Sequence, residues 1–323
     1  MKNCSQKNKL EEKYYCFIKG CIHPVTNLAR RSEGDRFTTP YANALAAMAF
    51  IHENEFSNAE KIFHPFQRYY QSNEDHFNGL PQIWNVETGL PDSTSIHWEG
   101  DAAFLSLALS YYQQKTKTDQ NLIEFQSGLT KWLLQRAKDA DLIVAESIAD
   151  MYAALIPWGK DKSIAEILEN LKKCFFSSDQ ICSSDYSHNL NHIIRGFLVF
   201  GDTSGFQYYK NFQQTETWEH NGSTKIIAFK FFSNDRFINI ETSALLLLAL
   251  KFRNEIFEYN DFRLCSEIER LTLPSSKNTH AAGIPSFATI RALDQSCRVP
   301  ALEPTCLMLF YYWGFNPLLL THK

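Results

Sequence analysis

The chain has 323 residues, a formal net charge of −4 at neutral pH and a pI near 6.2. Its basic residues form no stripe or tail, which argues against a nucleic acid as the main partner. No apolar run approaches the roughly 18–20 residues of a membrane span, and the N-terminal residues lack the apolar core of a cleaved signal. We therefore expect a cytoplasmic protein with no membrane partner.

The length would allow two domains, but no linker rich in proline, glycine or serine divides the chain. Hydrophobic residues make up 44% of the sequence and aromatic residues 14%, which is enough for one large core. We therefore expect a single domain over residues 1–323.

A pair of helices recurs along the chain: an apolar helix rich in small residues, a turn, and a more amphipathic second helix. In chain order, the expected pairs are residues 41–51 with 59–70, 97–112 with 121–138, 146–158 with 163–176, 188–200 with 205–212, and 241–252 with 261–273. The last apolar helix, 302–313, has no helix after it, so its expected partner is the N-terminal helix over residues 9–18.

The two helices of a pair differ in polarity. The first is apolar nearly all round, whereas the second carries charge on one face, as Lys162, Glu166 and Glu169 show. Amphipathicity places the first set inside and the second against water. The pattern predicts an all-α fold, an (α/α)6 toroid of helical hairpins in which the N-terminal helix closes the ring with the C-terminal helix. An open solenoid is the alternative, but the spacing of about 40 to 60 residues is looser than such arrays allow.

The cysteines and the glycines point to neither a metal nor a cofactor. The eight cysteines are scattered, and none forms a Cys-x-x-Cys pair, so we expect reduced thiols and no metal site. No glycine-rich phosphate loop, Gly-x-Ser-x-Gly elbow or His-Glu-x-x-His helix occurs, which removes several common enzyme classes. We expect no cofactor.

The inner helices of such a ring run in one direction, so the residues that open them become neighbours at one rim. Most of these residues are acidic or polar: Asp35, Asn43, Glu99, Asp101, Glu146, Asp150, His188, Asn189, Glu241 and Glu303. Carboxylates are favoured in the first turn of any helix, which offers a purely structural explanation for each one. Asp150, however, lies beyond the capping turn, and carboxylates inside a cavity cost desolvation energy.

An acidic cavity with aromatic rings suits the cleavage of a glycosidic bond. One protonated carboxyl gives a proton to the leaving oxygen, and one ionised carboxyl activates water or attacks the anomeric carbon. The candidates for these roles are Glu99, Asp101, Glu146, Asp150 and Glu241. Glu146 and Glu241 are the preferred pair because they come from different hairpins and could face each other across the cavity.

Other polar and aromatic residues are candidates for binding a small-molecule or oligosaccharide substrate. They are Asp35, Tyr41, Asn43, Trp84, His97, Trp98, Tyr152 and His188. Aromatic faces stack on the C–H surfaces of sugars, although a Trp or Tyr in such a helix is more often part of the core. The polar segments 73–96 and 202–235 are long enough to build a cleft.

Four stretches of the chain resemble the six-hairpin, (α/α)6-toroid glycosidase-like superfamily of bacterial carbohydrate-active proteins: residues 39–46, 99–109, 145–155 and 305–317. The resemblance implies a toroid fold and a carbohydrate substrate. Such proteins usually have an Asp where this chain has Asn43, and Ser147 and Ile148 replace a polar pair of the family pattern.

Three functions therefore stay open. The first is a carbohydrate-active hydrolase. The second is a cyclase or isomerase of an apolar substrate, with Asp101 or Asp150 as the proton donor and aromatic rings to stabilise a cation. The third is a non-catalytic protein, either a glycan-binding module or an interaction scaffold.

Overall fold

The structure is a computed structural model that describes residues 2–117, 119–177, 189–219, 223–233, 238–253, 261–286 and 299–319. The chain divides into two compact units. Unit 1 comprises Met1–Ile22, Arg30–Asp35 and Asp185–Asn316, and unit 2 comprises His23–Ala29, Arg36–Ser184 and Pro317–Lys323. The single-domain organisation stays a prediction.

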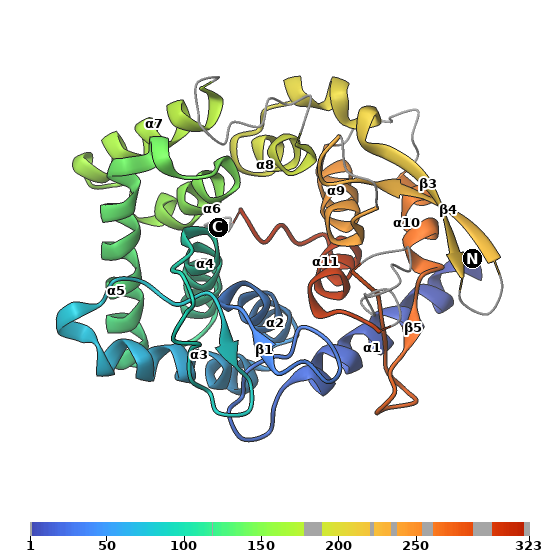
Figure 1. Ribbon diagram of the computed structural model, residues 1–323, viewed down its shortest axis with the longest axis horizontal. Helices are drawn as coiled ribbons and strands as arrows, with labels where there is room; N and C mark the ends of the chain where they lie inside the picture. Colours follow the sequence, from blue (N-terminus) through green and yellow to red (C-terminus); the bar gives the residue numbers. More distant parts are fainter. Residues whose placement is uncertain are drawn as a thin grey trace. The chain divides into compact units, whose positions relative to one another are not determined.

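Unit 2 consists of three helical hairpins, with inner helices α2, α4 and α6 and outer helices α3, α5 and α7 (Figure 1). Their bounds are Pro40–His52 (α2), Phe56–Ser72 (α3), Glu99–Lys115 (α4), Gln120–Arg136 (α5), Ala145–Leu155 (α6) and Lys162–Phe176 (α7). Helix α4 packs against both α2 and α6, and each inner helix packs against the outer helix that follows it. Short 3-10 helices η1 (Glu74–His76), η2 (Ala137–Leu142) and η3 (Ile156–Trp158) and the strands β1 (Phe37–Thr38) and β2 (Trp84–Asn85) complete the unit.

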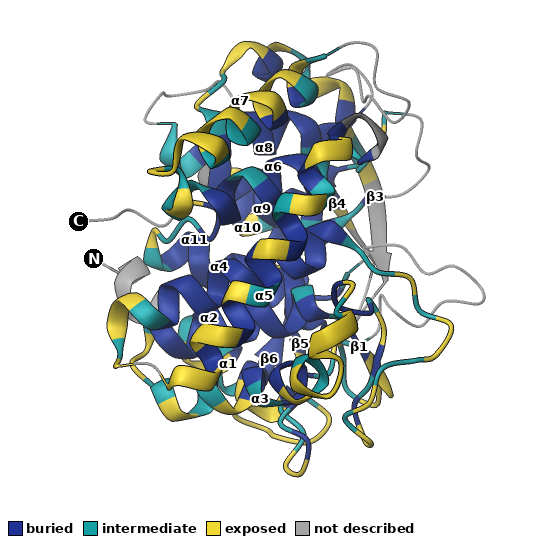
Figure 2. Ribbon diagram, turned by 90° about the vertical axis from the view of Figure 1, so that its left-hand side faces the viewer, coloured by how far each residue is buried: buried dark blue, intermediate teal, exposed yellow. Residues whose placement is uncertain are grey.

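Burial separates the two sets of helices as the sequence predicts. Helices α2 and α4 are buried along almost their whole length, whereas Leu171 and Phe175 are the buried residues of α7. Figure 2 shows the same contrast between the dark blue of α4 and the exposed positions of α5 and α7. The small side chains of α2, such as Ala44 and Ala47, allow its neighbours to approach from all sides.

Unit 1 contains helices α8 (Leu190–Phe200), α9 (Ile240–Phe252) and α11 (Leu302–Trp313), which pack in that order. Helix α10 (Asp261–Glu269) packs on α9, and the 3-10 helix η4 (Ser204–Phe212) packs on α8. Helix α1 (Lys2–Cys21) packs on α11, where the rings of Tyr14 and Tyr312 stack at 6.2 Å. The predicted pairing of the N-terminal with the C-terminal helix is therefore confirmed.

Side chains cap several helices and so locate their first turns. The capping residues are Thr39 for α2, Asp119 for α5, Asp161 for α7, Asn189 for α8 and Asn239 for α9. Each side chain accepts a hydrogen bond from a backbone N–H of the first turn, which otherwise has no partner within the helix. Pro40 follows Thr39 at the first helical position, where its missing N–H costs nothing.

The fourth pair differs from the predicted helical hairpin. Residues 205–212 lie within the 3-10 helix η4, and an antiparallel hairpin of β3 (Gln213–Glu219) and β4 (Ser223–Phe229) follows. The segment around β4 alternates exposed Lys225, buried Ile226, half-buried Ile227 and buried Ala228, which is the period of a half-buried strand. The polar segment 202–235, predicted to help build a cleft, therefore contains a 3-10 helix and two strands.

The second helix of the fifth pair is shorter than the predicted span 261–273. Helix α10 ends at Glu269, and Leu273 belongs instead to β5 (Leu273–Pro274), which pairs with β6 (Ala282–Gly283). The residue before a proline is driven towards extended backbone, so Pro274 favours a strand at Leu273. In the part of the chain that the structure describes, no helix is long and apolar enough to cross a membrane.

Candidate functional site

The acidic residues of unit 2 gather at the openings of α4 and α6. Glu99 and Asp101 lie in the first turn of α4, Glu146 in the first turn of α6, and Asp150 one turn later. The two helices pack against each other, and at Gly100 an added Cβ would lie 3.0 Å from Ser147 Oγ and 3.4 Å from Asp150 Oδ2. A side chain at position 100 would therefore require these neighbours to shift by a few tenths of an ångström. The four carboxyls at the openings of these two packed helices are called the acid cluster.

Arg136, at the C-terminal end of α5, holds one carboxylate of the acid cluster. Its Nε and Nη2 atoms each lie 2.7 Å from Glu99 Oε1. Glu99 is buried, so the guanidinium compensates a charge that water does not reach. Glu99 is thereby oriented within the cluster. The arginine was missed in the sequence because it lies 37 residues away on an outer helix, where no local pattern marks it.

The other acids of the cluster differ in exposure. Asp101 and Asp150 are buried, at 9% and 3% exposure, whereas Glu146 is half-buried. Helices α4 and α6 have no side-chain cap, and each carries a glutamate in its first turn. Glu99 and Glu146 therefore also interact favourably with the positive ends of their helices. An interaction with the start of the helix does not explain the buried position of Asp150, since this residue lies in the second turn of α6.

Asn43 is wholly buried and bonded within unit 2. Its Nδ2 donates to Thr38 Oγ1 at 2.9 Å and to the Thr39 carbonyl at 2.8 Å, and its Oδ1 accepts from the Ala29 backbone N–H at 2.8 Å. These bonds join the segment before α2 to the segment around Ala29. The amide, with both donors and an acceptor, explains why asparagine stands at this position.

A carboxylate in place of this amide should weaken the fold. We expect Asn43→Asp to lower the free energy of unfolding by about 2 kcal/mol, because a carboxylate cannot donate to Thr38 or to the Thr39 carbonyl. Urea unfolding measures the effect, with Asn43→Ala as the comparison. The loss should shrink at low pH, where a protonated Asp regains one donor. An Asn43→Asp protein as stable as the wild type would contradict these assigned bonds.

Of the two tryptophans predicted to bind substrate, one lies in the core and the other lies beside the acid cluster. Trp84 is fully buried, donates from Nε1 to the Pro81 carbonyl at 2.7 Å, and meets the rings of Phe66 and Tyr69 edge to face. It is therefore a core residue. Trp98, directly before α4, is only half-buried, and its Nε1 lies 3.2 Å from the Cβ position at Gly100, beside the acid cluster.

The other residues of unit 2 that were predicted to bind substrate lie in different parts of the unit. Tyr41 is half-buried and meets Phe104 edge to face, with ring centroids 4.7 Å apart. Burial, and then the charge of Glu169 on α7, raise the pKa of Tyr152. Tyr152 thus lies within reach of an outer helix. The His97 ring bonds the Asn78 carbonyl, which fixes the segment that leads into α4.

A second group of charges lies in unit 1, at the openings of α9 and α11. Arg31 Nε donates to Glu303 Oε1 at 2.5 Å, and the Glu303 side chain is only 2% exposed. Glu303 first of all, and then Glu241 and Asp35, raise the pKa of Arg31, which therefore stays protonated. Asp35 is exposed and accepts from Ser32 Oγ at 2.8 Å. Glu241 thus lies within electrostatic reach of an arginine that the sequence did not single out.

The opening of α8 adds two residues that were not predicted. Asn189 caps the helix by accepting from the His192 backbone N–H, and His192 and Arg195 are buried one turn apart. Their spacing of three residues is the available sequence signal, since it places both on one face of a helix. His188, the residue predicted here, lies outside the described residues. Glu146 and Glu241 belong to different units, so their separation stays a prediction.

Within the described ranges, no set of three or more His, Cys, Asp or Glu side chains is arranged to hold a metal ion. The carboxyls can instead exchange protons or accept hydrogen bonds.

Comparison with known proteins gives a likeness of fold without a likeness of sequence. No protein-family model and no curated protein sequence matches the chain. The solved structures that match over most of the chain include a glycosidase in complex with glucose, an α-amylase from Clostridium perfringens and a D-mannose isomerase. Their TM-scores are 0.70, 0.64 and 0.60, and their identities 11%, 10% and 10%. The matches cover 98%, 95% and 97% of this chain and 100%, 98% and 97% of the other.

These likenesses extend over almost the full length of every chain compared. The chain therefore has the fold of these toroid enzymes, and the predicted all-α (α/α)6 class is confirmed. At these identities the likeness establishes the fold alone.

Proposed function

We propose that the chain is a carbohydrate-active enzyme that hydrolyses a glycosidic bond. The observation that carries the proposal is the acid cluster at the openings of α4 and α6. This cluster lies in a fold that a glycosidase and an α-amylase also have. A polar group of carboxyls suits a sugar better than an apolar substrate, whose burial against them would cost desolvation energy.

Glu146 and Glu241 are the proposed acid and base. Glu99 and Glu303 are each bonded to an arginine, which suits positioning roles. Glu146 is half-buried, so a substrate can reach it. In the proposed step one carboxyl protonates the glycosidic oxygen as the C1–O bond breaks. The other activates a water or attacks C1. A separation of roughly 5–5.5 Å would give retention of configuration, and roughly 6.5–9.5 Å inversion.

Two aromatic residues support a sugar beside these acids. Trp98 is half-buried next to Gly100 and Asp150, and Tyr41 is half-buried on α2, which packs against α4. Their rings would cover the C–H face of a pyranose while carboxyls bond its hydroxyls. Asn43 and Trp84 are assigned to the support of the fold.

The test is product analysis in heavy-oxygen water. Oligosaccharides incubated with the protein in H₂¹⁸O should release a new reducing end that carries ¹⁸O at its anomeric carbon, because water supplies that oxygen. Mass spectrometry detects the label. No cleavage of any oligosaccharide would overturn hydrolysis. A thermal shift with sugars but no product would favour the non-catalytic glycan-binding alternative.

Sugar isomerisation is the second candidate, and two observations favour it. A D-mannose isomerase shares the fold, and His192, the commonest kind of general base, is buried at the opening of α8. In an aldose–ketose exchange, a base takes the proton from C2 and a proton is returned to C1. The C2 hydroxyl loses its proton and the C1 oxygen gains one, so that the carbonyl moves from C1 to C2. Free monosaccharides in D₂O would then take up deuterium from the solvent, whereas hydrolysis leaves their C–H bonds intact.

A further inference from the structure

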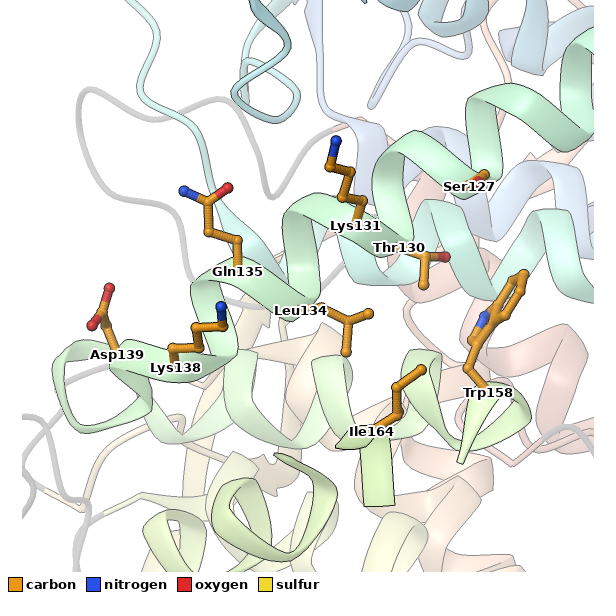
Figure 3. A pocket seen from close by; sticks show the side chains of 9 residues that line it. All are labelled: Ser127, Thr130, Lys131, Leu134, Gln135, Lys138, Asp139, Trp158 and Ile164. Atoms are coloured by element: carbon orange, nitrogen blue, oxygen red, sulfur yellow. The ribbon is translucent and has the colours of Figure 1, made fainter. Parts of the chain in front are cut away.

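Unit 2 has a pocket of about 710 Å³ away from the acid cluster, between α5, η2, η3 and α7 (Figure 3). No member of the acid cluster lines it. Arg136 follows the lining residue Gln135 in the chain, but it does not line the pocket and is bonded to Glu99. Its volume lies within the range of roughly 300–1,000 Å³ that small-molecule sites occupy. The pocket therefore has the size of a binding site in its own right.

One wall of the pocket is apolar and includes an exposed aromatic ring. Trp158, in η3, is 38% exposed, and Leu134 and Ile164 beside it are half-buried. Figure 3 shows Leu134 and Ile164 extending towards each other, with Trp158 next to them. An exposed indole next to aliphatic side chains is a platform for the C–H face of a sugar ring.

The rim of the pocket is polar and carries a net positive charge. Lys131 and Lys138 line the pocket together with Gln135, and Asp139 is the carboxylate of the lining. Neither lysine forms an ion pair with any residue in the described part of the chain. Two cations against one anion favour an anionic ligand, which the flexible lysines can reach from the rim.

Thr130 adds a polar group to the wall. Its side chain is 5% exposed, it lines the pocket, and its Oγ1 has no hydrogen-bond partner among the described residues. Buried hydroxyls in proteins nearly always have a partner. A ligand hydroxyl in the pocket could supply it.

We propose that this pocket is a second sugar-binding site, specific for a pyranose that carries a carboxylate or a phosphate group. The ring stacks on Trp158, the anionic group lies between Lys131 and Lys138, and a ring hydroxyl bonds Thr130. The choice of a sugar rests on the proposed function, whereas the charge and the aromatic platform rest on the pocket alone.

Titration calorimetry of the full chain tests the proposal with three probes: glucose, glucuronate and glucose 6-phosphate. At least one charged sugar should bind more tightly than glucose, and which of the two binds identifies the anionic group. Lys131→Gln combined with Lys138→Gln should weaken that binding about tenfold and abolish the preference over glucose. The matched control is Lys172→Gln with Lys173→Gln, which removes the same charge from exposed positions on α7 outside the lining.

Substitutions in the wall complete the test. Trp158→Ala should weaken binding about tenfold, and Trp158→Phe should restore most of the affinity because it keeps a ring. Thr130→Val should lower affinity without lowering the unfolding temperature, since it removes a buried hydroxyl that has no partner. Unchanged affinity in both the lysine and the tryptophan variants, or no saturable binding of either charged sugar, would overturn the proposal.

The proposed function and the proposed second site can be tested independently. If the pocket is not a sugar site, oligosaccharide cleavage is unaffected by the wall and rim variants. If the proposed hydrolysis is wrong, no labelled product forms, but binding of the charged sugars still depends on Trp158 and the two lysines.

Discussion

Replacing Glu146 by glutamine should lower turnover by about 10²–10⁴-fold, the contribution that one positioned acid or base makes. The substitution keeps the size of the side chain and one acceptor oxygen, replaces the other oxygen by an NH₂ donor, and removes the ability to gain or lose a proton. Its stability cost should be small, about 0.3–1 kcal/mol, because the side chain is half-buried and the substitution removes the favourable interaction of its charge with the start of α6. The rate of sugar release and the unfolding temperature are measured on the same sample.

Glu166→Gln is the matched control for this variant. Glu166 lies exposed on the outer helix α7, so neither turnover nor unfolding temperature should change. Full turnover together with a large loss of stability in Glu146→Gln would instead identify Glu146 as a helix cap or core anchor. The glycosidase assignment would then need another acid, for which Asp150 is the nearest candidate in the cluster.

Removing the guanidinium of Arg31 should cost the largest amount of stability. We expect Arg31→Met to lower the free energy of unfolding by about 3 kcal/mol, because it leaves the Glu303 carboxylate buried at 2% exposure without its partner. The midpoint of urea unfolding measures the loss. Since α11 is the C-terminal inner helix of unit 1, the loss should appear in the main unfolding transition.

Two further variants isolate the buried pair. Combining Arg31→Met with Glu303→Leu should recover most of the stability, since no unpaired buried charge remains. Arg270→Met, which breaks the pair with Glu267 at a position where the arginine is 49% exposed, should cost less than about 1 kcal/mol. An Arg31→Met protein no less stable than Arg270→Met would show that the Glu303 charge needs no partner.

The arrangement of helices in pairs was predictable from the sequence. A helix such as α9, with Ala244 to Leu250 apolar at every position, can only be buried, whereas α7 places charge on one face and must meet water. These properties depend on local segments and their periodicity, so they can be predicted without knowledge of long-range contacts. The residues that open the inner helices were predictable for the same reason.

The sequence failed where a neighbour distant in the chain decides the outcome. The strand pair of Gln213–Glu219 with Ser223–Phe229 is an exception, since its partners are close in the chain and residues 225–228 alternate with the period of a strand. Tyr41 and Trp84 have similar aromatic character, yet one is half-buried and the other fully buried. Packing by remote segments determines which aromatic ring a substrate can reach.

The helix pairs, their inner and outer faces and the acidic openings follow from local pattern, so they could be predicted from the sequence. Which acids are paired depends on long-range contacts: Arg136 pairs with Glu99 across two helices, and Arg31 pairs with Glu303 from the opposite end of the chain. The role of a buried carboxylate depends on the charged group beside it. The tertiary fold, and not the spacing in the sequence, determines which group that is.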